Sequence, residues 1–155
     1  MKFRRARCWL LLAGALVGGT AVADGLQVVR EGAVAYSCGG VGADERRAMK
    51  ALEPDANLKL LLVTAKRGGY LGGGELTVND AKGASVRIVA DGPVCLLRLP
   101  AGSYRIAAAM DGTTRAAQVV IGAGAGRLQR VVFAFPGEPW DGIWASPEEK
   151  LQAEE

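Results

Sequence analysis

The chain has 155 residues, half of them hydrophobic, and contains no histidine. Without an imidazole, Ser-His-Asp and Cys-His catalysis, histidine metal ligation and the commonest acid–base group at neutral pH are excluded. The formal net charge of +3 depends on residues 1–23, which hold four of the 19 basic residues and none of the 16 acidic ones, so the rest of the chain carries −1. The positive net charge of the full chain therefore does not indicate nucleic-acid binding, and we expect no nucleic-acid partner.

Residues 1–23 have the three parts of a cleaved secretory signal peptide. Basic residues lie among the first seven positions, residues 8–17 form an apolar stretch, and a run of small residues ends at Ala23. The apolar stretch is short for a membrane span, which disfavours the alternative of a retained anchor. We expect export to the periplasm with cleavage after Ala23, and no integral membrane segment in the remaining chain.

Residues 24–56 are predicted to form an N-terminal arm with a short helix. Residues 26–30 and 32–37 are short apolar pieces separated by glycine, and each is interpreted as either an edge strand or part of an ordered arm. A helix is predicted over residues 44–53, because acidic residues begin it and apolar residues recur at i, i+3 and i+4. Pro54 ends it.

From residue 57 onward the pattern changes to short segments of apolar or alternating residues, separated by turns that contain Gly and Asp. The segments predicted as strands are 57–66, 75–80, 84–90, 93–99, 103–110, 113–121 and 127–135. The last two are predicted to form a pair across a glycine-rich connection. The regular recurrence of short strand-like segments and turns predicts an all-β sandwich of about seven strands over residues 57–135, with one short N-terminal helix.

Residues 136–155 form a tail of different composition, with three prolines, Trp140, Trp144 and a charged end. Two interpretations of the tryptophans stay open. They fold back and cap the sandwich, or they form an exposed pair that docks a partner, since aromatic residues are enriched at interfaces.

Two cysteines, Cys38 and Cys95, follow the predicted signal peptide. In an oxidising compartment they permit one disulfide, and the alternative is two separately buried thiols. Two cysteines without histidine cannot build a Cys₄ or Cys₃His zinc site. Asp80, Asp91 and Asp111 are interpreted as turn residues rather than calcium ligands, because no Asp-x-Asp-x-Asp run is present. We therefore expect no metal site and no cofactor.

Residues 97–106 read Leu-Arg-Leu-Pro-Ala-Gly-Ser-Tyr-Arg-Ile, in which Pro100 ends one strand, Gly102 permits the reversal and Tyr104 returns to the core. This segment resembles the strand–turn–strand of carboxypeptidase regulatory-like domains, which have a transthyretin-like (prealbumin-type) β-sandwich. Residues 78–83 are similar to the same family's strand and Asp-x-x-Gly turn. The resemblance implies a prealbumin-like fold and no catalytic role.

The layout is also similar to that of small exported proteins of Gram-negative bacteria, in which a Ser-Gly-Gly-hydrophobic-Gly segment precedes a short helix. Here Cys38 is inserted into that segment. This loop and a second glycine-rich loop are candidate sites for the end of a peptide or glycan, and their residues are Ser37, Gly39, Gly40, Gly42 and Tyr70. The alternative is that the glycines let the chain pack closely or end an edge strand.

The sequence therefore predicts a non-enzymatic periplasmic binding or interaction module. It would present loops or an open strand edge to a protein, peptide or glycan partner in the cell envelope. The alternative is a structural or assembly component of the envelope that docks through the Trp140 and Trp144 tail. A hydrolase is disfavoured, because the transthyretin-like enzyme of purine catabolism depends on histidines that this chain lacks.

Overall fold

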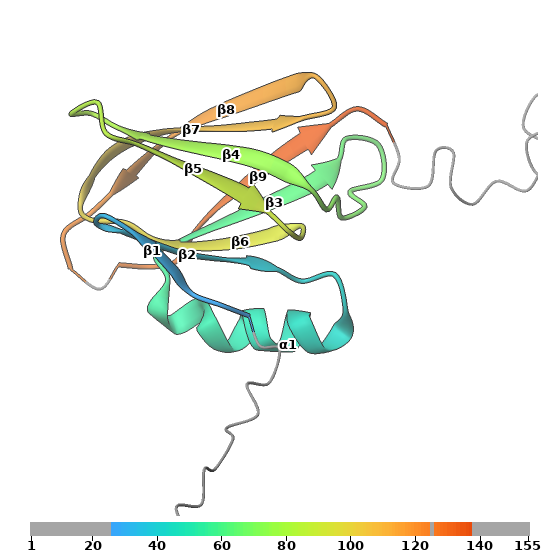
Figure 1. Cartoon of the computed structure of the whole chain (residues 1–155), viewed down its shortest axis with the longest axis horizontal. Helices are drawn as coiled ribbons and strands as arrows, with labels where there is room; N and C mark the ends of the chain where they lie inside the picture. The colour runs from blue at the N-terminus through green and yellow to red at the C-terminus, as the bar shows by residue number, and fades with distance from the viewer. Residues whose placement is uncertain (1–25, 125, 138–155) are drawn as a thin grey trace, which may run out of the picture.

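The computed structural model describes residues 26–124 and 126–137, which form two β-sheets and one α-helix (Figure 1). The predicted signal peptide (residues 1–23) lies outside these residues, and so do Trp140 and Trp144. Among the described residues, no helix has the length and apolar character needed to cross a membrane.

The larger sheet, sheet A, has five strands. In spatial order they are β1 (Val29–Glu31), β2 (Val34–Gly39), β6 (Val94–Arg98), β3 (Leu58–Thr64) and β9 (Gln129–Phe135). Neighbours are antiparallel except β3 and β9, which are parallel. The smaller sheet, sheet B, is antiparallel throughout, and its order is β5 (Ser85–Ala90), β4 (Gly74–Asp80), β7 (Gly102–Met110) and β8 (Thr113–Ile121).

The main core lies between the inner faces of the two sheets. Alternation along each strand decides which residues face inward: Val86, Ile88 and Ala90 of β5 point to the core, as their spacing predicts. The interior strand β3 is apolar except for Lys59 and Thr64, because both of its faces are covered. Leu60 packs between the sheets, whereas Leu61 lies on the outer face of sheet A.

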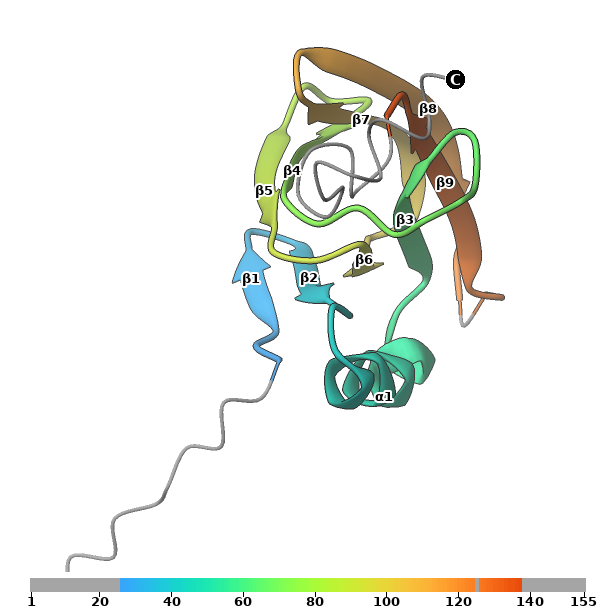
Figure 2. The ribbon, with the colours of Figure 1, turned by 90° about the vertical axis from the view of Figure 1, so that its right-hand side faces the viewer.

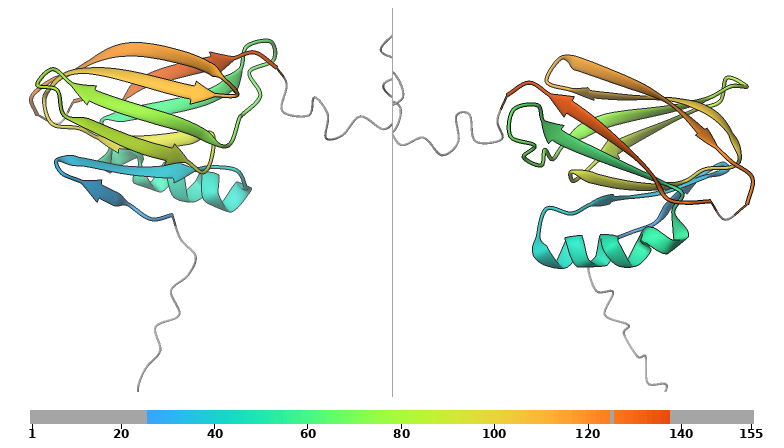
Figure 3. Two further views of the ribbon diagram at one scale, coloured as in Figure 1. Left: turned by 45° about the horizontal axis from the view of Figure 1, so that its top comes forward. Right: turned by 180° about the vertical axis from the view of Figure 1, so that it is seen from behind.

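The helix α1 (Ala43–Leu52) covers the outer face of sheet A (Figure 3, right). Met49 packs there against Leu61, Val94 and Leu96, and forms a second apolar cluster with them. A single 3-10 turn, η1 (Glu53–Asp55), follows the helix and contains Pro54, which cannot continue an α-helical hydrogen-bond pattern.

Nine strands are present in the described residues rather than about seven. The two additional strands are β1 and β2. The sequence was compatible with either edge strands or an ordered arm in this region. β2 lies inside sheet A, between β1 and β6, so the chain before residue 57 shares a sheet with the strands that follow it. The composition of β2 (Val-Ala-Tyr-Ser-Cys-Gly) is weakly apolar, which is why its interior position escaped prediction.

The predicted pairing of the last two strands is wrong. β8 pairs with β7 in sheet B, and β9 pairs in parallel with β3 in sheet A. The reason is the connection between them, residues 122–128, which is long enough to cross from one sheet to the other instead of closing a tight hairpin.

Cys38 and Cys95 lie opposite each other in the β2–β6 register and are joined by a disulfide bond. The bond is nearly buried, because Cys95 is 1% exposed. With a sequence separation of 57 between the cysteines, the chain-entropy model gives a stabilisation of about 4 kcal/mol. It links the first part of the chain to the middle of sheet A.

Candidate functional site

The glycine loop before α1 is already occupied by the protein's own groups. The backbone N–H groups of Gly40 and Val41 both donate to Oε2 of Glu45 at 3.0 Å. Gly39 is buried, and a side chain on Gly92 would collide with its backbone. The geometry matches the alternative in which these glycines allow close packing, and Gly42 is the residue before the first turn of the helix.

The other candidate residues do not converge on that loop. Tyr70 lies between β3 and β4, is 53% exposed and forms a single bridge with Val63. Ser37 is buried, with its side chain on the outer face of sheet A. Trp140 and Trp144 are outside the described residues. The five described candidates therefore do not form one site.

One lateral side of the sandwich is closed by side-chain hydrogen bonds between its two edge strands. Nε2 of Gln129 in β9 donates to the carbonyl of Val120 in β8 at 2.7 Å. Nε of Arg115 in β8 donates to the carbonyl of Ala134 in β9 at 3.1 Å. These contacts use outward-facing carbonyls of both strands, so neither edge is free along its whole length.

The opposite side has the edges of β1 and β5, which lie together at the left of Figure 2. β5 is six residues long and pairs only with β4. The Asp80 N–H donates to the carbonyl of Ala84 at 2.9 Å, which fixes the alternation of the antiparallel ladder. Continuing that alternation, the backbone groups of Ser85, Arg87 and Val89 face away from β4. They form an unpaired strand edge.

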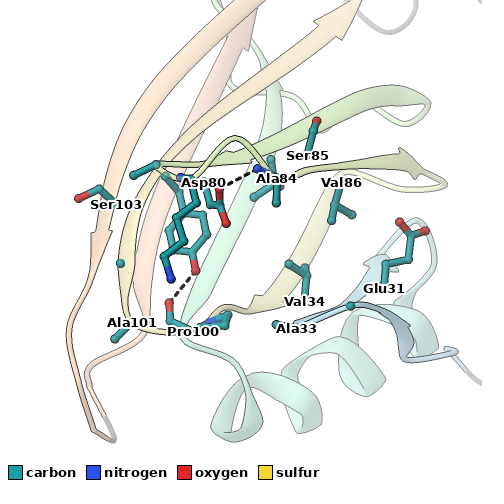
Figure 4. Close-up of a pocket in the computed structure, with 16 residues that line it drawn as sticks. Glu31, Ala33, Val34, Asp80, Ala84, Ser85, Val86, Pro100, Ala101 and Ser103 are labelled. Atoms are coloured by element: carbon teal, nitrogen blue, oxygen red, sulfur yellow. Dashed lines mark hydrogen bonds between the residues drawn. The ribbon is translucent and has the colours of Figure 1, made fainter.

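A cavity of about 560 Å³ lies beside this edge, between the two sheets. We call it the seam cleft. Val34 and Val86 lie on its facing walls, with Glu31 and Asp80 at the rim (Figure 4). The buried residues Val78 and Tyr104 also line it. Its volume and largely apolar walls are those of a small binding site.

Two hydrogen-bonded turns give the seam cleft its shape. Oδ1 of Asp80 accepts from the N–H groups of Lys82 and Ala84, each at 2.8 Å, which fixes the β4–β5 turn as an Asx turn. The hydroxyl of Tyr104 donates to the carbonyl of Pro100 at 2.8 Å and holds the β6–β7 turn.

The ionisable groups around the seam cleft are few. Burial, and then the charge of Asp80, raise the pKa of the Tyr104 hydroxyl. Burial also raises the pKa of Tyr36, whose hydroxyl donates to Oε1 of Glu31 at 3.2 Å. Within the described part of the chain, no three His, Cys, Asp or Glu residues are grouped so that they could hold a metal ion. The arrangement suits binding of an apolar group better than acid–base chemistry.

Comparisons of the chain with protein-family models, with curated proteins and with solved structures found no match.

Sequence reasoning did not find the seam cleft. Its residues come from three separate segments, at residues 31–34, 78–86 and 100–104, and no local pattern links them. The alternation of residues 84–90 indicates which side chains face inward but carries no information on whether the strand is central or at an edge.

Proposed function

We propose that this protein is an exported, non-enzymatic interaction module that binds an extended segment of a partner protein in the cell envelope. The partner segment adds a strand to β5 and places apolar side chains in the seam cleft. The observation that carries the proposal is the unpaired edge of β5 directly beside that cleft.

Strand addition needs donors and acceptors at the spacing of a β-ladder. The outward-facing backbone groups of Ser85, Arg87 and Val89 supply them. Side chains of an added strand alternate between the two faces of the sheet, so every second one continues the inner face formed by Val86 and Ile88. Those side chains meet the apolar walls of the cleft, and pocket contacts of this kind provide specificity in strand addition.

The other three edges are less suitable. β1 has only three residues, and a ladder of that length offers few hydrogen bonds. Outward-facing carbonyls of β8 and β9 are used by Gln129 and Arg115. β5 carries one charged side chain, Arg87, and that side chain pairs with Glu75 of β4 at 3.2 Å. Natural proteins usually protect exposed strand edges with charges, prolines or bulges. An edge without such protection therefore suggests that it receives a partner strand.

The compartment and the fold family are part of the same proposal. Periplasmic export is supported by the signal-peptide pattern of residues 1–23 and by the disulfide between Cys38 and Cys95, a bond typical of oxidising compartments. The prealbumin-like assignment is supported by the Leu-Pro-x-Gly-x-Tyr motif, in which the Tyr104 hydroxyl donates a hydrogen bond to the carbonyl of Pro100. Absence of histidine supports a role without catalysis.

The proposal is tested by selecting binders from a displayed library of random hexapeptides, with the chain from Asp24 to Glu155 as target. We expect peptides with alternating apolar residues. In the variant Val89→Pro, an outward N–H is lost while the ladder to β4 is kept, and affinity for a selected peptide falls about tenfold or more.

Val120→Pro is the matched control, because Val120 has the same exposure of 66% and lies on the β8 edge. Its carbonyl, which accepts from Gln129, is unchanged. Equal binding by the Val89→Pro variant, or a saturating library that yields no binder above background, would reject strand addition at β5.

A further inference from the structure

A second cavity lies on the other face of sheet A, between β1 and the end of α1. Its volume is about 500 Å³, and we call it the outer groove. Val28, Leu52 and Leu96 form an apolar lining, and Val28 is 51% exposed although it is a large hydrophobic residue. The groove is separated from the seam cleft by the thickness of the sheet, because β2 presents Val34 to the cleft and Ala35 to the groove.

Two arginines flank the floor of the outer groove. Arg30 of β1 and Arg98 of β6 are both register partners of Ala35 in β2, so the three residues form one row across the sheet. Cross-strand partners share a face, and strands are about 4.8 Å apart, which places the two arginines about 10 Å from each other at the backbone. The small side chain of Ala35 leaves the space between them open.

Neither Arg30 nor Arg98 forms a salt bridge with a carboxylate of the described residues. Nη1 of Arg98 donates to the main-chain carbonyl of Asp55 at 3.0 Å, which orients its guanidinium at the rim. Asp55 is the one acidic residue among those that line the groove, so the lining residues comprise two basic residues and one acidic residue.

The buried hydroxyl group of Ser37 is an independent indication that the outer groove binds a ligand. Ser37 lies two residues from Ala35 along β2, lines the same groove, and is 4% exposed. Its hydroxyl has no hydrogen-bond partner among the described residues, and it is the one buried side-chain polar atom there without a partner. Buried hydroxyl groups are rarely left without a hydrogen bond, so this one indicates a partner from outside the described chain.

We propose that the outer groove binds a single-chain anionic amphiphile. Its carboxylate or phosphate head lies between Arg30 and Arg98, which suit such oxygens because guanidinium groups can form two parallel hydrogen bonds to them. The Ser37 hydroxyl donates to the same head. The alkyl chain lies along Val28, Leu52 and Leu96. This site is on the opposite face of sheet A from the seam cleft and does not depend on strand addition to β5.

The test is calorimetric titration of the chain from Asp24 to Glu155 with dodecanoate and with dodecyl phosphate, below the concentrations at which they form micelles. We expect saturable binding of both. Acetate and inorganic phosphate lack the chain and bind much more weakly, and dodecyltrimethylammonium lacks the negative charge and also binds much more weakly. Vesicles of anionic phospholipid test a membrane surface as the source of the head group, and we expect no comparable binding.

Variants separate the contributions of charge and hydroxyl. Arg30→Gln keeps an exposed polar residue, so we expect a folded protein with at least about fivefold weaker binding of dodecanoate. Ser37→Ala weakens binding in the same direction. Arg105→Gln changes an exposed arginine of β7 in sheet B and leaves the affinity unchanged. The proposal is overturned if the cationic amphiphile binds as well as dodecanoate, if Arg30→Gln binds like the unaltered chain, if vesicles bind more tightly than the monomeric amphiphiles, or if neither anion binds.

Discussion

At the scale of single residues, a few side-chain hydrogen bonds fix the turns that shape the seam cleft. Tyr104 is the clearest example, because its ring is buried in the core while its hydroxyl reaches the carbonyl of Pro100. The residue thus connects the packing of sheet B to the position of the β6–β7 turn.

Replacing Tyr104 by Phe removes that hydrogen bond and keeps the ring. We expect the free energy of unfolding to fall by about 1 kcal/mol, the usual net contribution of such a bond. Urea denaturation measures it. Tyr70→Phe, at a tyrosine that is 53% exposed, serves as the control and should leave stability within about 0.5 kcal/mol. Equal stability of both variants would show that the bond does not hold the turn.

The tyrosines also predict how stability depends on pH. The pKa of Tyr36 and that of Tyr104 are raised above the ordinary value of 10.0, chiefly by burial. A raised pKa in the folded state means that the contribution to stability is complete below about pH 10 and is lost as the pH rises through the raised value.

We therefore expect the urea midpoint to fall as the pH rises above about 10, and to fall less in the double variant Tyr36→Phe, Tyr104→Phe. Every other ionisable group is common to the two proteins. An identical drop in the two proteins would contradict the assignment to these tyrosines.

At the scale of elements, the helix and the strands differ in how much of their placement the sequence predicts. The strong apolar run of residues 57–66 predicts a strand in the interior of a sheet, and the structure confirms it, with β3 between β6 and β9. Leu60 packs on one side of the sheet and Leu61 on the other. The parallel partner of β3 was not predictable, because β9 is far away in sequence and its alternation is equally compatible with a hairpin to β8.

The candidate site was less predictable than the fold. Residues such as Val34 and Val86 have ordinary strand character, and they become cleft walls only because two distant strands are both at sheet edges. The glycine loop, in contrast, has a conspicuous sequence, yet its donors are satisfied by Glu45. Local composition thus pointed to a loop whose donors are already satisfied. It could not point to the seam cleft, since edge position is a property of the whole sheet.

The packing of α1 on sheet A gives a prediction for the helix. Met49 is 3% exposed and is the buried residue of this helix. We expect Met49→Ala to lower the free energy of unfolding by about 2 to 5 kcal/mol, because it leaves a cavity against sheet A. Lys50→Ala, at the neighbouring exposed position, should change it by less than about 0.5 kcal/mol in urea denaturation. Similar losses in both variants would mean that the helix is held by its propensity rather than by packing.

At the scale of the whole molecule, the disulfide ties the N-terminal part of the chain to the middle of sheet A. Replacing both Cys38 and Cys95 by Ala is expected to cost about 4 kcal/mol of unfolding free energy through the larger entropy of the unfolded chain. Denaturation with and without a reductant measures this. The double variant should be insensitive to the reductant, whereas the unaltered chain should lose stability in it. Equal sensitivity of the two proteins would contradict the assignment.

The sandwich as a whole is asymmetric: Gln129 and Arg115 close one side, and β1 and β5 leave the other side open beside the seam cleft. Hydrogen exchange at the β5 amides tests this most directly. In the free protein we expect fast exchange at Ser85, Arg87 and Val89, slow exchange at Val86 and Ile88, and slow exchange at all five when a selected hexapeptide is bound. Strong protection of the first three amides in the free monomer, or no change on binding, would contradict an open edge that receives a partner strand.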